Sequence, residues 1–70
     1  MGEKADQALK EFNEAWEQAR KIEQEAMELV KQEGQKDYTL IEDKFRQADG
    51  FIKKRNDAFK RHLSHLNNGE

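Results

Sequence analysis

The sequence predicts an all-α fold, an antiparallel hairpin of two helices spanning about residues 3–33 and 39–66. Three observations support this prediction. The 70 residues contain no proline, apolar residues recur in steps of three and four through both halves, and a polar stretch with glycine separates the halves. Charged residues make up 40% of the chain and apolar ones 34%, which taken alone approaches the composition of disordered chains. The regular apolar spacing instead indicates amphipathic helices.

The first half carries a heptad pattern of mostly small apolar side chains. Its seam consists of Ala5, Ala8, Phe12, Ala15, Ala19, Ile22, Ala26 and Leu29. A second row of Leu9, Trp16 and Val30 widens this apolar face. A seam that continues without a gap over more than three heptads predicts one long helix, which we place at residues 3–33.

The connection is predicted where the apolar pattern stops, in the stretch EGQKDYT. Gly34 can adopt the left-handed conformation that often ends a helix. Thr39 and Glu42 have the spacing of a capping box, in which each side chain accepts a hydrogen bond from the backbone of the other residue. The second helix is therefore expected to begin near Thr39.

The second half has its own seam and one internal interruption. The seam consists of Ile41, Phe45, Ala48, Ile52, Arg55, Phe59, His62 and Leu66, with Phe51, Ala58 and Leu63 beside it. The seam keeps its phase across Gly50, so we expect one helix to continue through that residue. The alternative is a kink at Gly50 that produces a short third helix and a three-helix fold. Because the first seam is rich in alanine and the second in large side chains, we expect small residues to pack against large ones.

The apolar stripes are wider than one helix pair can cover, which predicts an interface. We assign Leu9, Trp16, Val30, Phe51 and Arg55 to this interface. An exposed patch of this kind usually marks a binding surface, and a symmetric dimer that forms a four-helix bundle covers it most simply. Another helical protein is the alternative partner. A third helix formed after Gly50 would cover the patch within one chain.

Arg55 is a charged residue in an apolar seam, where it is costly unless paired. One reading is an interhelical pair with a glutamate of the first helix, such as Glu23, that fixes the register. The other reading is a contact with a carboxylate or phosphate of a partner.

The sequence offers little support for catalysis. It has no cysteine, its four glycines are scattered, and its only serine, Ser64, has no convincing base because adjacent helix residues do not face each other. His62 and His65 have a spacing that metal-binding helices use, but no carboxylate accompanies them within one turn. We therefore expect no enzyme activity, cofactor, metal or small-molecule substrate. The prediction is a non-enzymatic protein interaction module, a small regulatory or adaptor protein.

The alternative function is a small nucleic-acid-binding regulator. Lys53, Lys54, Lys60 and Arg61 form a basic set that could bind a polyanion. However, residues 1–37 carry six Lys/Arg against ten Asp/Glu, and residues 38–70 carry seven against five. The acidic half is expected to weaken attraction for nucleic acid, so we regard such binding as the minor hypothesis.

The expected compartment is cytoplasmic. No apolar run approaches the roughly 20 residues of a membrane span, and no signal-peptide segment is evident. At 70 residues, the chain is expected to form one domain.

Overall fold

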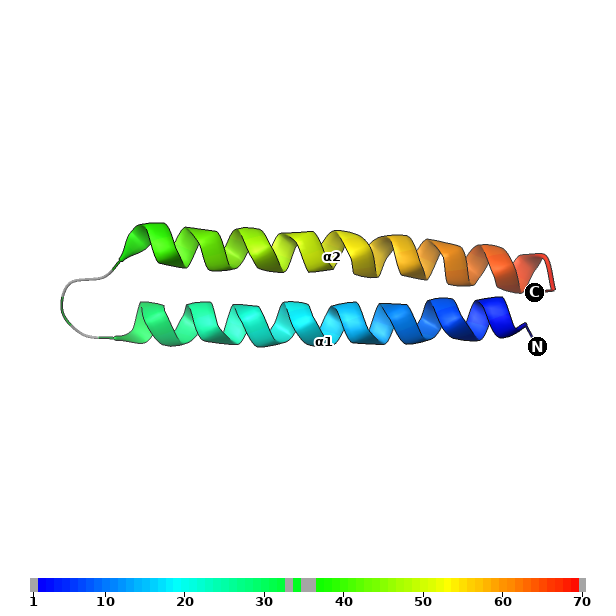
Figure 1. The fold of residues 1–70 in the computed structure, drawn as a ribbon, viewed down its shortest axis with the longest axis horizontal. Coiled ribbons are helices and arrows are strands. Elements are labelled where there is room, and N and C mark those ends of the chain that lie inside the picture. The colour runs from blue at the N-terminus through cyan, green and yellow to red at the C-terminus, as the bar shows by residue number, and fades with distance from the viewer. Residues whose placement is uncertain (1, 33, 35–36, 70) are drawn as a thin grey trace.

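The computed structural model describes residues 2–32, 34 and 37–69 and contains two long helices, α1 (Glu3–Lys31) and α2 (Tyr38–Asn67). The helices lie side by side and antiparallel, with both chain termini at one end (Figure 1). Together they form a rod of 55 × 13 × 11 Å. The predicted helical hairpin is confirmed, with both helices within two residues of the predicted bounds.

The end of α1 comes slightly earlier than predicted. The helix stops at Lys31, and Gln32 is already extended, while residue 33, the predicted last position, lies outside the described residues. Gly34 has a φ of +94°, in the left-handed region where glycine is favoured. Gly34 thus adopts the expected conformation, but α1 has already ended at Lys31, three residues before it.

The predicted capping box at the start of α2 is wrong. The cap is Asp37, whose side chain accepts a hydrogen bond from the Leu40 backbone amide at 3.1 Å. Asp37 is extended and directly precedes the first helical residue, Tyr38, so Thr39 lies inside the first turn. Aspartate ranks slightly above threonine at this position, and its charge also suits the positive end of the helix dipole.

The predicted alternative of a kink at Gly50 is also wrong, because α2 runs without interruption from Tyr38 to Asn67. Gly50 is exposed, and no heavy atom outside its own helix turn would meet an added Cβ within 4 Å. Glycine in a helix interior costs about 1 kcal/mol relative to alanine. The packing of the apolar seam on both sides of Gly50 therefore stabilises the helix by more than the glycine destabilises it.

The buried line of contact between the helices consists mostly of alanine. The buried residues are Ala5, Ala8, Ala15, Ala19 and Ala26 of α1 and Ile41, Ala48 and Ala58 of α2. Two of the three buried residues of α2 are alanine as well, so the large side chains of the second seam do not fill the line of contact as expected. Ala58, predicted beside the seam, is 1% exposed, whereas the seam residues Phe45 and Phe59 are 38% and 43% exposed. Alanine allows two helices to approach closely, and bulky side chains must then lie to either side of the line of contact.

Three cross-helix contacts fix the register, which the sequence alone left open. The His62 ring donates through Nδ1 to the Ala5 carbonyl oxygen at 2.7 Å. The rings of Phe12 and Phe59 have centroids 5.5 Å apart. Near the loop, Lys44 pairs with Glu25 at 2.8 Å. Residues at the same level of the rod therefore have numbers that add to about 70.

The cap at Asp37 gives a direct test of how α2 begins. We expect Asp37→Ala to lower the free energy of unfolding by about 1 kcal/mol, as measured for lost N-caps. Thr39→Ala is the matched control and should change it by much less. Urea denaturation followed by circular dichroism measures both, and a larger loss for Thr39→Ala would restore the capping-box assignment.

The alanine contact predicts that added volume separates the helices. Ala19 is 0% exposed, so Ala19→Leu should cost about 1–3 kcal/mol, the usual range for overpacking. Gln24→Leu adds a leucine at an exposed position of the same helix and should be nearly neutral. Equal stability of the two variants in urea denaturation would show that the helices are not in close contact at Ala19.

Candidate functional site

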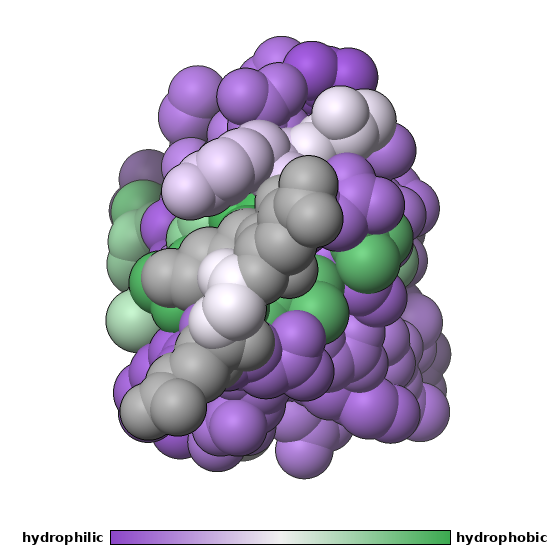
Figure 2. All heavy atoms as spheres, turned by 90° about the vertical axis from the view of Figure 1, so that its left-hand side faces the viewer, coloured by the Kyte–Doolittle hydropathy of each residue, from purple (hydrophilic) through white to green (hydrophobic). Residues whose placement is uncertain are grey.

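Large apolar side chains line one side of the hairpin, and on α1 their row is interrupted by Glu23, midway between Trp16 and Val30. This apolar face consists of Leu9, Phe12, Trp16 and Val30 of α1 and Phe45, Ile52, Phe59 and Leu66 of α2. Residues seven apart lie on the same side of a helix, and the contacts of Phe12 with Phe59 and of Trp16 with Arg55 place the two rows next to each other. Seen from the loop end, hydrophobic residues reach the surface on the flanks between the helices, while hydrophilic residues cover their outer sides (Figure 2).

Much of the apolar face is open to solvent. Leu9, Trp16 and Val30 are each 37% exposed, and Leu66 is 53% exposed. No large side chain among the described residues is fully buried. The predicted interface residues Leu9, Trp16 and Val30 therefore lie on the same side of the hairpin. The other five members of the apolar face are residues that the sequence placed in the helix contact: Phe12, Phe45, Ile52, Phe59 and Leu66. The regular spacing of seven residues within the α2 row was visible in the sequence.

Arg55 joins the apolar face through Trp16. Its guanidinium carbon lies 4.5 Å from the centroid of the Trp16 ring, and that of Arg20 lies 6.0 Å from it, both within the range of cation–π attraction. Arg55 also donates two hydrogen bonds to Asn56 Oδ1, at 2.8 and 3.1 Å. The predicted pair of Arg55 with Glu23 is wrong. The tryptophan face and the neighbouring amide stabilise the half-buried guanidinium instead.

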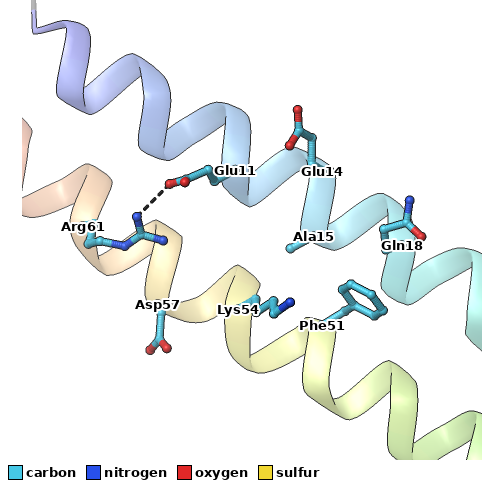
Figure 3. A pocket seen from close by; sticks show the side chains of 8 residues that line it. All are labelled: Glu11, Glu14, Ala15, Gln18, Phe51, Lys54, Asp57 and Arg61. Carbon is cyan, nitrogen blue, oxygen red and sulfur yellow. Dashed lines mark hydrogen bonds and ion pairs between the residues drawn. The ribbon is translucent and has the colours of Figure 1, made fainter.

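Phe51 lies on the opposite side of the hairpin from Trp16. It lines an open groove together with Ala15 and Gln18 of α1, toward which its ring projects (Figure 3). The rim of this groove is charged, and Arg61 Nη1 pairs with Glu11 Oε2 at 2.7 Å. Phe51 is only half-exposed. We call this side the charged face and define it by Glu11, Glu25, Lys44, Phe51, Lys54 and Arg61. The sequence predicts that Phe51 shares an interface with Trp16, and this prediction is wrong because Phe51 lies on the charged face.

Among the residues that the structure describes, the ion pairs of Glu11 with Arg61 and of Glu25 with Lys44 join the helices on the charged face. Besides Glu11 and Arg61, Lys44 Nζ donates to Glu25 Oε1 at 2.8 Å. The hydrogen bond from Lys44, reinforced by its positive charge, lowers the pKa of the Glu25 carboxyl below its ordinary value. Both pairs are solvent-accessible, so each contributes little energy. They bring together residues from the acidic and basic halves of the chain.

The four predicted polyanion-binding residues do not act as one free patch. Arg61 is paired with Glu11, and Lys54 Nζ lies 5.2 Å from the centroid of the Phe51 ring. Lys53 and Lys60 are exposed. They are seven residues apart and so share the outer side of α2. The structure thus divides the basic stretch between the charged face and the outer surface.

His62 has a structural contact at the end of the rod opposite the loop. Its hydrogen bond to the Ala5 carbonyl joins the two helices, and its ring centroid lies 6.4 Å from that of Phe59. Among the described residues, no group of three or more histidine, aspartate or glutamate side chains could hold a metal ion. Within the same residues, neither helix has an apolar stretch long enough to cross a membrane.

Comparison of the chain with protein-family models, with curated proteins and with solved structures gave no match. The candidate site therefore rests on the geometry of the chain itself.

The pair of Glu25 and Lys44 predicts a pH-dependent contribution to stability. Because the pKa of Glu25 is lowered on folding, the contribution is present above the ordinary glutamate pKa of about 4.3. It is lost as the pH falls through the lower pKa of the folded state. Glu25→Gln should therefore lower the urea midpoint at pH 7, and the difference from wild type should shrink toward pH 3. Glu28→Gln, at an exposed position of the same helix, is the control, and an equal pH dependence of both variants would contradict the assignment.

Proposed function

We propose that this protein is a non-enzymatic interaction module that self-associates through its apolar face into a four-helix bundle. The observation that carries the proposal is the alanine contact between the helices. Alanine supplies little buried apolar area, and a domain of this size already has difficulty burying enough. Eight large apolar side chains lie instead along the apolar face, where most of them are partly exposed.

The surface area of the hairpin supports the same proposal. It exposes 5523 Å², whereas a compact monomer of 8.3 kDa is expected to expose about 4,600 Å². The excess of about 900 Å² is close to the roughly 800 Å² that each partner contributes to an interface of standard size. A second hairpin laid along the apolar face would remove surface of this order and thicken a rod that is only 11 Å deep in its thinnest direction.

A second copy is favoured over an unrelated helical partner because the face suits a symmetric contact. In a two-fold dimer the same patch serves both subunits and must be complementary to itself. The face contains both small gaps and bulky residues, with a row of four apolar side chains on α2 and three on α1. Two such surfaces can interdigitate as layers do in four-helix bundles.

Nucleic-acid binding through Lys53, Lys54, Lys60 and Arg61 receives less support. Arg61 already pairs with Glu11, and the aromatic ring beside these cations, Phe51, is only half-exposed and already lies 5.2 Å from Lys54 Nζ. An anisotropy titration with RNA and DNA at about 150 mM salt tests this alternative. Tight binding that is lost in the charge-reversed Lys53→Glu/Lys60→Glu variant would favour it over the interaction module.

Self-association predicts that the midpoint of thermal unfolding rises with protein concentration. Phe45→Ala should weaken the dimer, because burying a large side chain is worth roughly 1.5–3 kcal/mol and each dimer contains two copies of Phe45. Phe51→Ala is the matched control on the charged face of the same helix and should leave the dimer intact. Sedimentation equilibrium measures all three proteins, and an 8.3 kDa monomer for the wild type at high micromolar concentration would refute the proposal.

A further inference from the structure

The apolar face carries two positive charges near the middle of the rod. Arg20 and Arg55 both lie against the Trp16 ring, and we call these three residues the arginine cluster. Trp16 is the fourteenth of 29 residues in α1, and Arg55 the eighteenth of 30 in α2. An interface that covers this cluster partly desolvates two guanidinium groups. Such burial is costly unless an acidic group of the partner faces them.

Two hairpins can meet face to face with two-fold symmetry in two ways. If the symmetry axis runs across the rods, the loops lie at opposite ends and α1 packs on α1 of the other copy. With full overlap, residues at mid-length then face their own copies. With α1 spanning Glu3–Lys31 and α2 spanning Tyr38–Asn67, facing residues have numbers that add to about 34 in the two α1 helices and to about 105 in the two α2 helices. Arg20 would then lie opposite Asn13 of the other copy and Asp49 opposite Asn56, and both asparagines are uncharged.

If the axis runs along the rods, the loops lie at the same end and α1 packs on α2 of the other copy. Residues at the same level then face each other, and their numbers add to about 70, as within one hairpin. Arg20 and Asp49 satisfy this relation. Arg20 borders the apolar face on α1, four residues after Trp16, and Asp49 borders it on α2, three residues before Ile52. Asn13 and Asn56 occupy the next matching level along the same two borders.

We propose that the second copy docks with its loop at the same end, so that Asp49 of each copy pairs with Arg20 of the other. This inference rests on the proposed self-association and adds its orientation and register. Asp49 and Arg20 are both exposed in the single hairpin and so are accessible to a partner. Complementary charges at the border of an apolar interface fix its register and reject alternative arrangements.

The orientation can be measured directly because the chain contains no cysteine. Gln32→Cys places a single spin label at the loop end, at an exposed position just after α1. Labels on two copies with loops at the same end should be separated by less than half of the 55 Å rod. A separation that approaches the full rod length, from a protein that is dimeric, would overturn the proposed orientation and leave the self-association intact.

The pairing is tested by mixing two charge-reversed chains. Arg20→Asp places two acids at the contact, and Asp49→Arg places two cations there, so each variant should self-associate about tenfold more weakly than wild type. In an equimolar mixture, each acid meets a cation of the other chain. The mixture should then recover wild-type association and contain mainly heterodimers.

Lys21→Asp and Asp57→Arg form the control mixture. These two substitutions reproduce the same net charges on the same two helices, at positions away from the apolar face. Circular dichroism verifies that all variants remain helical, and native mass spectrometry counts the heterodimers. A heterodimer excess no larger than in the control would overturn the Asp49–Arg20 pairing. A wild-type chain that remains monomeric at every concentration would overturn the proposed function on which the inference rests.

Discussion

The close approach of α1 and α2 along their alanines is the constraint on which the rest of the structure depends. Alanine has no side chain beyond Cβ, so the two backbones can approach closely and leave no room for larger groups between them. Phe45, Phe59 and Leu66 must therefore lie beside the contact, where about two-fifths or more of each remains exposed. This arrangement gives the hairpin a rigid line of contact and very little interior. The large residues of the apolar face, from Leu9 to Leu66, then keep between 37% and 53% of their surface exposed where they are not half-buried, and that surface is available for a second interaction.

The two sides of that contact differ in chemistry. On the charged face, Glu11 and Glu25 reach across to cations of α2, and these bonds stay in water. On the apolar face, Trp16 is covered by the guanidinium of Arg55. One side of the hairpin thus satisfies its own charges internally, and the other presents aromatic and aliphatic groups. The basic stretch of α2 spans both the charged face and the outer surface, which explains why it does not form one binding patch.

The sequence was sufficient to predict the helices, their antiparallel packing and most of α1, because the alanine seam repeats without a gap. It was less informative for α2, where the apolar residues occupy adjacent rows and periodicity alone does not decide which row is buried. The rows that contain Ala48 and Ala58 are the buried ones, because these small residues allow α1 to approach closely. For the same reason the side on which Phe51 lies could not be predicted, since it depends on which row of α2 faces α1. The partner of Arg55 was missed because a half-buried cation can be stabilised by an aromatic ring as well as by an acid.

The hairpin geometry also determines the order in which the molecule can assemble and open. Contacts near the loop join residues close in sequence, as in Glu25 and Lys44, 19 positions apart, whereas Ala5 and His62 are 57 positions apart. The entropy lost on closing a chain segment grows with the length of that segment. The two helices therefore associate most easily beside the connecting loop, and their contact then extends turn by turn toward the termini. The hydrogen bond between His62 and Ala5 is the contact that forms at the end of the rod opposite the loop. Fraying should accordingly start where both termini meet and travel toward the loop, so amide hydrogens near the termini should exchange before those flanking the turn.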